Sequence, residues 1–470
     1  MVPASPGGYW RRPAGFVFAA IAALVGVGVV LRLPMLAQAH GGAAFLSVYL
    51  FWMVAVAWPL LTAETLFGRV MRQDLPGALY DDVRTRGSTR GWLLIAGLFL
   101  LVPLLVVSYY SVIAGWNAAF AVRALGGALA GASADGLSTP FLTLAQDAER
   151  SMAWQTIFVV ASCVLVARGI RVGIERGAAL LLLGGVVLLF LLGILVIRDG
   201  DPARVTALWT RWDWGALGWR GVLEALQQAL FSAGLGLGMM AAYAGYLPER
   251  ARPARLTAMV LVGSTVFALI AGSLLMGLLG DMSSAGNGQM ALLFVAPVEL
   301  AVRLDGRLTP GAIYLLMTAL SVASTVALLE PLAQFVMARK RCTRVYATTV
   351  IGVAVWLLGL VTVLTFGSTV LGELGGRSLF GWLQSFSIRL GAPLALLLMV
   401  IYVGRVWSRV ELDAALHGHS EPREGPDARP TRRALLMRFM LVYPTRIAAI
   451  LALVYGLGIA DWFIAFWSDT

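Results

Sequence analysis

Two short glycine-interrupted stretches lie inside long apolar segments of the chain. The first is Val25-Gly26-Val27-Gly28-Val29, and the second is Gly234-Leu235-Gly236-Leu237-Gly238. Glycine allows a membrane helix to break, and the freed N–H and C=O groups are tolerated where they face a cavity instead of lipid. Amides exposed at a helix N-terminus attract anions, and free carbonyls attract cations. The pair therefore predicts a binding site, although either stretch alone is also typical of close helix packing.

The composition is that of a protein with many membrane spans. Of 470 residues, 59% are hydrophobic and 13% are charged, and the mean hydropathy is +0.82. Soluble globular domains are far more polar. The apolar run 15–39 is too long for the core of a cleaved signal peptide, so we expect it to remain in place as the first span.

The net charge of +11 does not indicate a nucleic-acid partner. With the N-terminus placed in the cytoplasm, most basic residues fall in loops on the cytoplasmic side, as the positive-inside rule requires. The exceptions include Arg32, Arg389 and Arg446, which lie inside predicted spans. The pattern predicts a multi-pass protein of a bacterial-type inner (plasma) membrane, in contact with anionic lipid and without a nucleic-acid partner.

The residue types that catalyse reactions or bind metals do not form an enzyme-like pattern. Cys163 and Cys342 are predicted to lie in or beside spans, so no disulfide framework or metal site is expected. His40, His417 and His419 lack metal-ligand spacing, and the last two fall in a polar stretch. The sequence contains neither a Ser-His-Asp order nor a phosphate-binding loop. We therefore expect a protein that is not an enzyme and has no cofactor other than a sodium ion.

Apolar runs of about 20 residues predict 11 transmembrane helices in a single domain, 1–470. Ten of them divide into two sets of five, 14–197 and 219–406, and each set begins with a glycine-broken segment, as in an inverted repeat. The polar stretch 412–433 is predicted as a flexible cytoplasmic loop before helix 11 at 438–466. This odd number places the C-terminus outside. The predicted spans are Ala14–Gln38, Ala43–Arg69, Gly91–Val122, Trp154–Arg168, Gly173–Ile197, Trp219–Tyr246, Leu256–Leu279, Pro310–Ala338, Tyr346–Phe366, Leu379–Val406 and Arg438–Phe466.

Further motifs accompany the glycine stretches in a consistent order. They are Arg32-Leu33-Pro34, Gly41-Gly42-Ala43-Ala44-Phe45, Ser108-Tyr109-Tyr110 with Gly115-Trp116, Gly173-Ile174-Glu175-Arg176, Gln228-Ala229-Leu230-Phe231-Ser232, and Ser324-Thr325 followed by Glu330-Pro331. Together they resemble the neurotransmitter:sodium symporter family, and the chain is similar to a divergent member of its bacterial amino-acid transporter branch. The resemblance implies the all-α fold of bacterial leucine transporters, a 5+5 inverted repeat with helices 1 and 6 unwound.

The resemblance also implies a substrate site at the two breaks. Amides of the first break, here Val27 and Gly28, and a third-helix tyrosine, here Tyr110, bind the substrate carboxylate in the family. The alternative for Tyr110 is a core tyrosine bonded to a backbone carbonyl. The biogenic-amine branch carries an aspartate where this chain has Gly26, which favours free amino acids over monoamines, and the largely apolar pocket lining implied by the resemblance favours a neutral, apolar or aromatic one. The other implied substrate-binding residues are Val25, Phe231 as a lid, Gly234 with extra room, Leu237, Ser324 and Leu328.

The two sodium sites of the family are only partly matched. The first would use Leu24, Val29, Ser232 and Ser264, and the Val29 side chain has no oxygen to offer. The second would use carbonyls of Ala22, Val25 and Leu320 with hydroxyls at positions 323 and 324, where this chain has Ala323 and Ser324. A missing neutral ligand costs about 1–3 kcal/mol. We therefore expect sodium coupling that is weakened or reduced to one ion, with the second site as the better preserved.

The gate residues that the resemblance implies are Arg32, Phe231 and Tyr246. The acidic partner expected for Arg32 aligns near Phe380, and the acid expected on the inside aligns at Ala338, so both expected charge pairs are lost. An arginine inside a span needs a partner, so another group is expected to meet Arg32.

Four further positions are interpreted from the sequence and from the same resemblance. Arg389 is predicted either to line the outer vestibule and attract anions or to extend its charged end to water. Glu64 and Glu330 match structural positions of the family, and Glu64 is expected to accept hydrogen bonds from the unwound part of helix 6. The helix 7 position of the family's chloride site aligns near Ala268, which is not an acid.

These features favour a secondary active transporter that takes up a small neutral amino acid or a related carboxylate by alternating access. One alternative is a sodium-independent carrier on the same fold, coupled to protons or working by exchange. The other is a sensor that binds a ligand without transporting it. The sequence does not define the oligomeric state.

Overall fold

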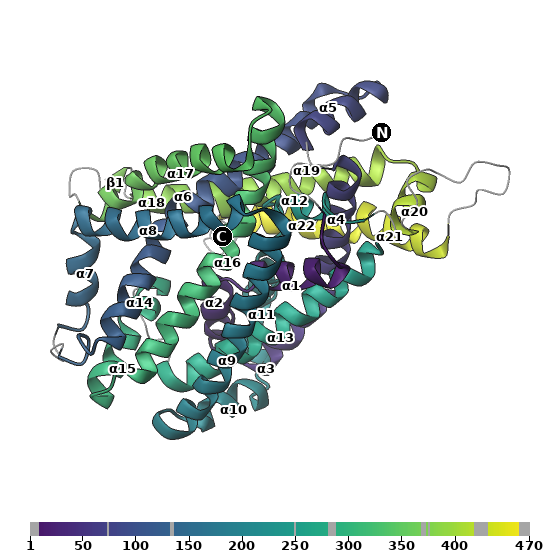
Figure 1. The fold of residues 1–470 in the computed structure, drawn as a ribbon. Helices are drawn as coiled ribbons and strands as arrows, with labels where there is room; N and C mark the ends of the chain where they lie inside the picture. The colour runs from purple at the N-terminus through teal and green to yellow at the C-terminus, as the bar shows by residue number, and fades with distance from the viewer. Residues whose placement is uncertain are drawn as a thin grey trace.

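The computed structural model describes residues 9–72, 75–131, 136–248, 251–280, 288–367, 373–374, 377–417 and 431–459. These residues are almost entirely helical, as Figure 1 shows. The described part of the chain contains a single pair of strands, the short antiparallel strands β1 (Glu373–Leu374) and β2 (Arg377–Ser378). The prediction of an all-α polytopic protein is confirmed.

The first half of the chain follows the predicted order of spans. π-Helical turns at Met53–Ala57 and Ile170–Glu175 continue into α4 and α9, so each span is longer than its regular helix. The helices are α1 (Pro13–Leu24), α2 (Val27–Ala39), α3 (Ala43–Trp52), α4 (Trp58–Met71), α5 (Leu75–Thr85), α6 (Leu93–Leu125), α7 (Thr139–Ala145), α8 (Ala148–Ala167), α9 (Arg176–Asp199) and α10 (Pro202–Thr210).

The second half is built in a similar way and also contains short helices outside its spans. A π-helical turn at Ser385–Gly391 joins α18 to α19. The helices are α11 (Trp214–Ser232), α12 (Met239–Ala244), α13 (Pro253–Leu279), α14 (Gly288–Phe294), α15 (Ala296–Leu304), α16 (Leu308–Lys340), α17 (Arg344–Gly367), α18 (Leu379–Gln384), α19 (Ala392–Arg405), α20 (Arg409–His417), α21 (Arg432–Val442) and α22 (Pro444–Gly456).

Nine helices of the described residues are long and apolar enough to cross a membrane, and the bent pair α1 and α2 makes ten if it forms one span. The chain is therefore a multi-pass membrane protein. The predicted span Trp219–Tyr246 is divided between α11 and the short α12. The number of membrane-spanning helices given above therefore does not include it. The total of 11 spans and the inverted repeat stay predictions.

The first span breaks where the Val-Gly-Val-Gly stretch predicted it. Helix α1 ends at Leu24, α2 begins at Val27, and the two axes differ by 60°. Gly26 is extended, with φ −83° and ψ 161°, so its lack of a side chain matters for space rather than for backbone conformation. A Cβ atom there would lie 3.2 Å from Ser324 Oγ and 3.9 Å from the Tyr110 hydroxyl. Gly26 therefore allows the break to approach two other helices.

The second break depends on glycine in a different way. Gly234, Gly236 and Gly238 have φ values of +60°, +77° and +70°, which L-residues with side chains rarely adopt. These three residues carry the chain from α11 to α12 without a regular helical turn. Sequence alone thus located both breaks, and the structure adds that only the second requires left-handed backbone.

The predicted loop 412–433 differs from the structure at its start. Residues up to His417 belong to α20, because Leu412 and Ala415 are spaced for one helix face and are 1% and 5% exposed. The segment 418–430 lies outside the described residues, and so does the end of predicted helix 11 beyond 459. That helix begins earlier than predicted, at Arg432, and is interrupted at Tyr443 before Pro444, whose ring cannot continue regular hydrogen bonding.

The short helices gather at the two ends of the bundle. Figure 1 shows α7, α10 and α15 at one end, and α5 and α20 at the other, near the N-terminal segment. Helices α6 and α16 pack along each other in the centre, and α1 packs against α16. The end with α5 and α20 is cytoplasmic in the predicted orientation.

The outer end of α2 is held by the segment that leads into α11. The Gly42-Ala43 turn meets this segment through a bond from the Ala43 N–H to the Arg211 carbonyl at 2.8 Å. Asp213 caps α11 by accepting from the Ala216 N–H at 3.0 Å. That hydrogen bond, together with the Arg211 guanidinium, lowers the pKa of the Asp213 carboxyl.

Candidate functional site

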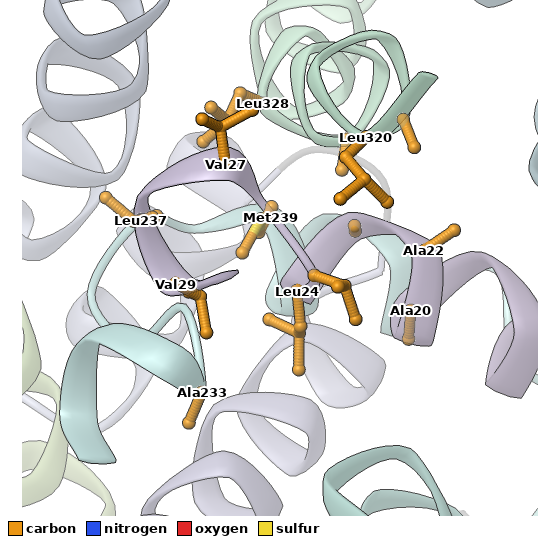
Figure 2. Packing of buried hydrophobic residues seen from close by; sticks show 14 of the residues in the cluster. Ala20, Ala22, Leu24, Val27, Val29, Ala233, Leu237, Met239, Leu320 and Leu328 are labelled. Carbon is orange, nitrogen blue, oxygen red and sulfur yellow. The ribbon is translucent and has the colours of Figure 1, made fainter. Parts of the chain in front are cut away.

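A cavity of about 350 Å³ lies between the two helix breaks. Its walls come from α1, α2, α6, α11, α14, α16 and the second break. Eight of the nine predicted substrate-binding residues line it, namely Val27, Gly28, Tyr110, Phe231, Gly234, Leu237, Ser324 and Leu328. Most of the other lining side chains are apolar. Figure 2 shows Val27 and Val29 beyond the first break, and Ala22 and Leu24 before it.

One wall of the cavity has the chemistry of an anion site. The amides of Val27 and Gly28 lie in the first turn of α2, where N–H groups have no carbonyl of the same helix to bond. The Tyr110 hydroxyl donates to Ser321 Oγ at 3.3 Å, and the Val27 amide also lies against it. Tyr110 is only partly buried and lines the cavity. Its side-chain partner is therefore a serine, whereas the alternative interpretation required a backbone carbonyl.

The opposite wall is apolar, and Phe231 forms its outer edge. A Cβ atom on Gly28 would lie 3.2 Å from Phe231 Cζ, so the ring packs closely over the first turn of α2. Met290 and Leu293 of α14 line the cavity as well. The expected lid position of Phe231 is consistent with this placement.

Two expectations about the pocket differ from the structure. The extra room expected at Gly234 is filled, because a Cβ atom there would lie 2.0 Å from Met239 Cε and 2.6 Å from Leu24 Cδ2. Figure 2 shows Met239 between the two broken segments. Val25 is fully buried and is not among the residues that line the cavity. A substrate would therefore meet Met239, and it would not meet the Val25 side chain.

The predicted second cation site lies where α1 ends against α16. The side chains of Ala22 and Leu320 are both 2% exposed, and Ser324 is 8% exposed. Ser324 Oγ donates to the Ala23 carbonyl at 3.0 Å, and this bond uses its hydrogen and leaves its two lone pairs available to a cation. The last carbonyls of a helix lack amide partners within that helix. These oxygens together can supply the hard ligands that sodium prefers.

The predicted first cation site is less suited to a cation. The Val29 side chain lines the cavity and offers no oxygen. Ser264 Oγ donates to the Leu261 carbonyl of its own helix at 3.2 Å, and Ser232 Oγ accepts from Gln228 at 3.3 Å. Within the described ranges, no group of three or more His, Cys, Asp or Glu residues is arranged for a metal ion.

A second cavity of about 480 Å³ lies on the outer side of the first and shares Arg32 and Phe231 with it. Glu224 of α11 and Arg389 also line this vestibule, and both charges act on Arg32. Glu224 accepts from the Tyr455 hydroxyl at 3.1 Å and lies 3.6 Å from His40 Nε2. Glu224 thus provides the carboxylate near Arg32 that sequence alignment failed to find at Phe380.

Phe380 itself packs edge-on against Tyr109, with ring centroids 5.6 Å apart. Arg389 is exposed in the vestibule, and this position agrees with both interpretations of its role.

The inner end of the site is closed by a charge pair that the sequence did not suggest. Arg344, at the start of α17, bonds the carboxylate of Glu330 on α16, and the Tyr246 hydroxyl donates to the same carboxylate at 2.7 Å. Arg344 also donates to the Val166 carbonyl at 2.6 Å. Ala338, where alignment placed the inner acid, is exposed. Tyr246 therefore lies in a closing network whose acid is Glu330.

The N-terminal segment covers this inner network. Trp10 is 4% exposed, and its indole Nε1 donates to the Tyr243 carbonyl at 2.9 Å. The Arg11 amide donates to Glu175 at 3.0 Å. The central cavity adjoins a vestibule on its outer side, and the inner network closes its other end. The cavity is therefore accessible from the end of the bundle with α7, α10 and α15.

Glu64 behaves as predicted from the sequence. Its Oε2 atom accepts from the Gly236 N–H at 3.2 Å, which confirms the expected bond to the unwound part of helix 6. Four residues later, Gly68 packs directly on α12, since a Cβ atom there would lie 2.0 Å from the Ala241 carbonyl oxygen. The span containing α4 therefore holds the second break through one polar contact and one backbone contact.

The residues that sequence reasoning missed are Glu224, Arg344 and Met239. An acid within a predicted span, ten residues before Gly234, was a signal for Glu224. The need of buried Glu330 for a cation was a signal for Arg344, the basic residue nearest to the start of the next helix. Nothing in the sequence pattern indicated that Met239 fills the space beside Gly234.

Comparison with known proteins finds similarity to sodium-dependent transporters. Residues 8–141 match the model of the sodium:neurotransmitter symporter family. A sodium-dependent transporter of Bacillus subtilis is 31% identical over 56% of this chain, and the match spans only 57% of that protein. A sodium-dependent transporter of Haemophilus influenzae is 21% identical over 74% of this chain and 78% of its own length.

Among solved structures, this chain is similar to MhsT in complex with L-phenylalanine. The two share a TM-score of 0.81 and 27% sequence identity, over 96% of this chain and 99% of that one. This similarity extends over nearly the whole chain and confirms the predicted leucine-transporter-like fold.

Proposed function

We propose that this chain is a secondary active transporter of a neutral amino acid, and its matches to the sodium:neurotransmitter symporter family model and to MhsT support this proposal. The observation that carries this proposal is the cavity of about 350 Å³, which has free helix amides and Tyr110 on one side and apolar side chains on the other. A free amino acid has the same division between a carboxylate and a side chain. Its relatives are transporters rather than enzymes.

The substrate class follows from the lining of the cavity. Arg32, at the outer edge, is the one charged residue among the described residues that line the cavity, and Leu237, Leu328 and Met239 form the apolar part. A buried charge on the substrate side chain would lack a partner there and would cost several kcal/mol. We therefore favour an apolar or aromatic amino acid, and the phenylalanine bound by MhsT is of this class.

Sodium coupling through the second site is part of the proposal. Ser324 and the carbonyls of Ala22, Val25 and Leu320 form that site, while the first site lacks an oxygen at Val29. We propose coupling to a single sodium ion. The protein would lie in a bacterial-type inner membrane with its N-terminus in the cytoplasm and its C-terminus outside.

The test is a thermal-shift screen of the purified full chain in detergent. Neutral amino acids, beginning with phenylalanine, are added in sodium chloride and in choline chloride. We expect an apolar or aromatic amino acid to raise the melting temperature in sodium and to do so much less in choline. Glutamate and lysine serve as matched controls, because each adds a charged side chain that the cavity does not compensate.

The outcomes separate the proposal from its alternatives. An equal rise in choline would favour the sodium-independent carrier. The ligand found in the screen is then supplied in radiolabelled form to proteoliposomes, where binding without uptake would favour the sensor. If glutamate or lysine gives the largest shift, the proposed substrate class is wrong.

A further inference from the structure

Arg446 of α22 is buried, and none of the described residues provides a partner for its charge. It is 9% exposed, and its Nε and Nη2 atoms have no hydrogen-bond acceptor among the described residues. The guanidinium packs on α19, since a Cβ atom on Gly404 would lie 2.8 Å from Nη2. Arginine stays charged in proteins, and a buried charge without a partner is strongly unfavourable. An acceptor from outside the described chain is therefore expected at Arg446.

The charged groups that act on Arg446 are themselves positive. They are Arg405, at the end of α19, and Arg438 of α21. Arg438 donates to the Trp407 carbonyl at 3.3 Å, and the Trp407 indole Nε1 is buried with no acceptor in the described structure. This arginine cluster, Arg405, Arg438 and Arg446, therefore consists of donors and positive charge, which is the composition of an anion site.

The carboxylates near the cluster are already engaged elsewhere. Glu411 of α20 bonds Arg86 at 2.8 Å, and Asp413 accepts from the Thr431 hydroxyl at 2.6 Å. No ion pair joins either acid to a member of the cluster among the described residues. The described residues therefore leave this charge to be neutralised by a ligand.

The surface beside the cluster points to a lipid. Phe439, Tyr443 and Ile447 of α21 and α22 are 55%, 58% and 58% exposed. In a membrane protein such apolar side chains face acyl chains, and aromatic residues favour the interface. The cluster lies at the end of the bundle with α20, which is beside α21 in Figure 1. In the predicted orientation that end faces the leaflet rich in anionic lipid.

We propose that the arginine cluster between α19, α21 and α22 binds the phosphate of an anionic glycerophospholipid. The guanidinium of Arg446 donates to the phosphate oxygens, Arg405 and Arg438 supply further positive charge, and the acyl chains lie along Phe439, Tyr443 and Ile447. The bound lipid holds the interrupted eleventh helix against α19. This site is distinct from the substrate cavity and does not depend on the proposed function.

The direct test uses the full chain in detergent with three added probes: dioleoyl phosphatidylglycerol, dioleoyl phosphatidylcholine and inorganic phosphate. We expect phosphatidylglycerol alone to raise the melting temperature. Arg446→Gln removes charge-assisted hydrogen bonds and should raise the phosphatidylglycerol concentration needed for a half-maximal shift about tenfold or more. Arg433→Gln, which loses one exposed charge near the start of α21, is the matched control and should behave like the wild type.

Equal shifts with phosphatidylcholine or inorganic phosphate, or an unchanged lipid response in Arg446→Gln, would overturn the proposal. A second variant keeps the test decisive if Arg446→Gln does not fold. In lipid-free detergent, Arg405→Gln should melt at a higher temperature than the wild type, because it removes a like charge near Arg446. With phosphatidylglycerol this advantage should disappear. A lower melting temperature for Arg405→Gln in both conditions would contradict the idea that the cluster is uncompensated without lipid.

Discussion

Replacing Arg344 by methionine should open the inner end of the transporter. The Arg344 and Glu330 side chains are 6% and 0% exposed, so solvent does not screen their interaction. Removal of one member of a buried, hydrogen-bonded pair costs about 3–5 kcal/mol, because the other charge stays buried without compensation. Glu330 becomes hydrated only if the inner end opens. The variant should therefore shift the equilibrium toward the inward-open state by about 10²- to 10⁴-fold.

The measurement is the rate at which N-ethylmaleimide labels a cysteine at Ala242. This residue is 3% exposed, and its carbonyl accepts from Gln334 beside Glu330 at 3.0 Å. Cys163 and Cys342 are first replaced by alanine. Labelling should be slow in the parent protein and much faster with Arg344→Met.

Two controls define what the labelling rate reports. The double variant Arg344→Met with Glu330→Gln removes both charges, so it should return toward the slow rate of the parent protein. Arg339→Met loses an exposed charge at the same end of α16 and should change little. Slow labelling of Arg344→Met, or labelling of the double variant as fast as that of the single variant, would refute the proposed role of this pair.

Three further predictions concern the central site. Tyr110→Phe removes one hydrogen bond to the substrate carboxylate and should weaken binding about 10- to 100-fold; calorimetry that finds unchanged affinity would exclude this role. Ser324→Ala should abolish sodium-dependent binding, and Ala323→Thr should lower the sodium concentration for half-maximal binding, whereas Val29→Asn alone should change little. If Ser324→Ala leaves the sodium dependence of binding unchanged, the second site is excluded. Met239→Ala should free the space beside Gly234 and raise the affinity for tryptophan relative to smaller amino acids, as measured by competition binding. The same relative affinities in the variant and the wild type would show that Met239 does not limit the pocket.

The fold was predictable from the sequence because its decisive features are local. Glycine pairs at Gly26 and Gly28, and at Gly236 and Gly238, mark the two breaks, and apolar runs mark the spans between them. The family resemblance carried by these motifs predicted that Tyr110 and the amides of α2 share one site, and both line the same cavity. Since α20 is short and amphipathic, the high polarity around it concealed a helix within the predicted loop.

The parts of the site that were not predictable depend on distant contacts. Met239 fills the space at Gly234 only because the second break turns back on itself through left-handed glycines. Glu224 acts on Arg32 from another broken helix, and Arg344 bonds Glu330 from the next span. Alignment to the family pattern placed the two acids at Phe380 and Ala338, whereas this chain has acids at Glu224 and Glu330.

The contacts between α4 and the second break define which parts of the molecule move together. Glu64 bonds the Gly236 amide, and the backbone at Gly68 touches α12 at Ala241 with no side chain between them. Because such contacts resist sliding, we expect α4 and α12 to move as one rigid body in the proposed alternating-access cycle. The flexible joint of the second broken helix is then expected near Gly234, so that α12 moves with α4 rather than with α11.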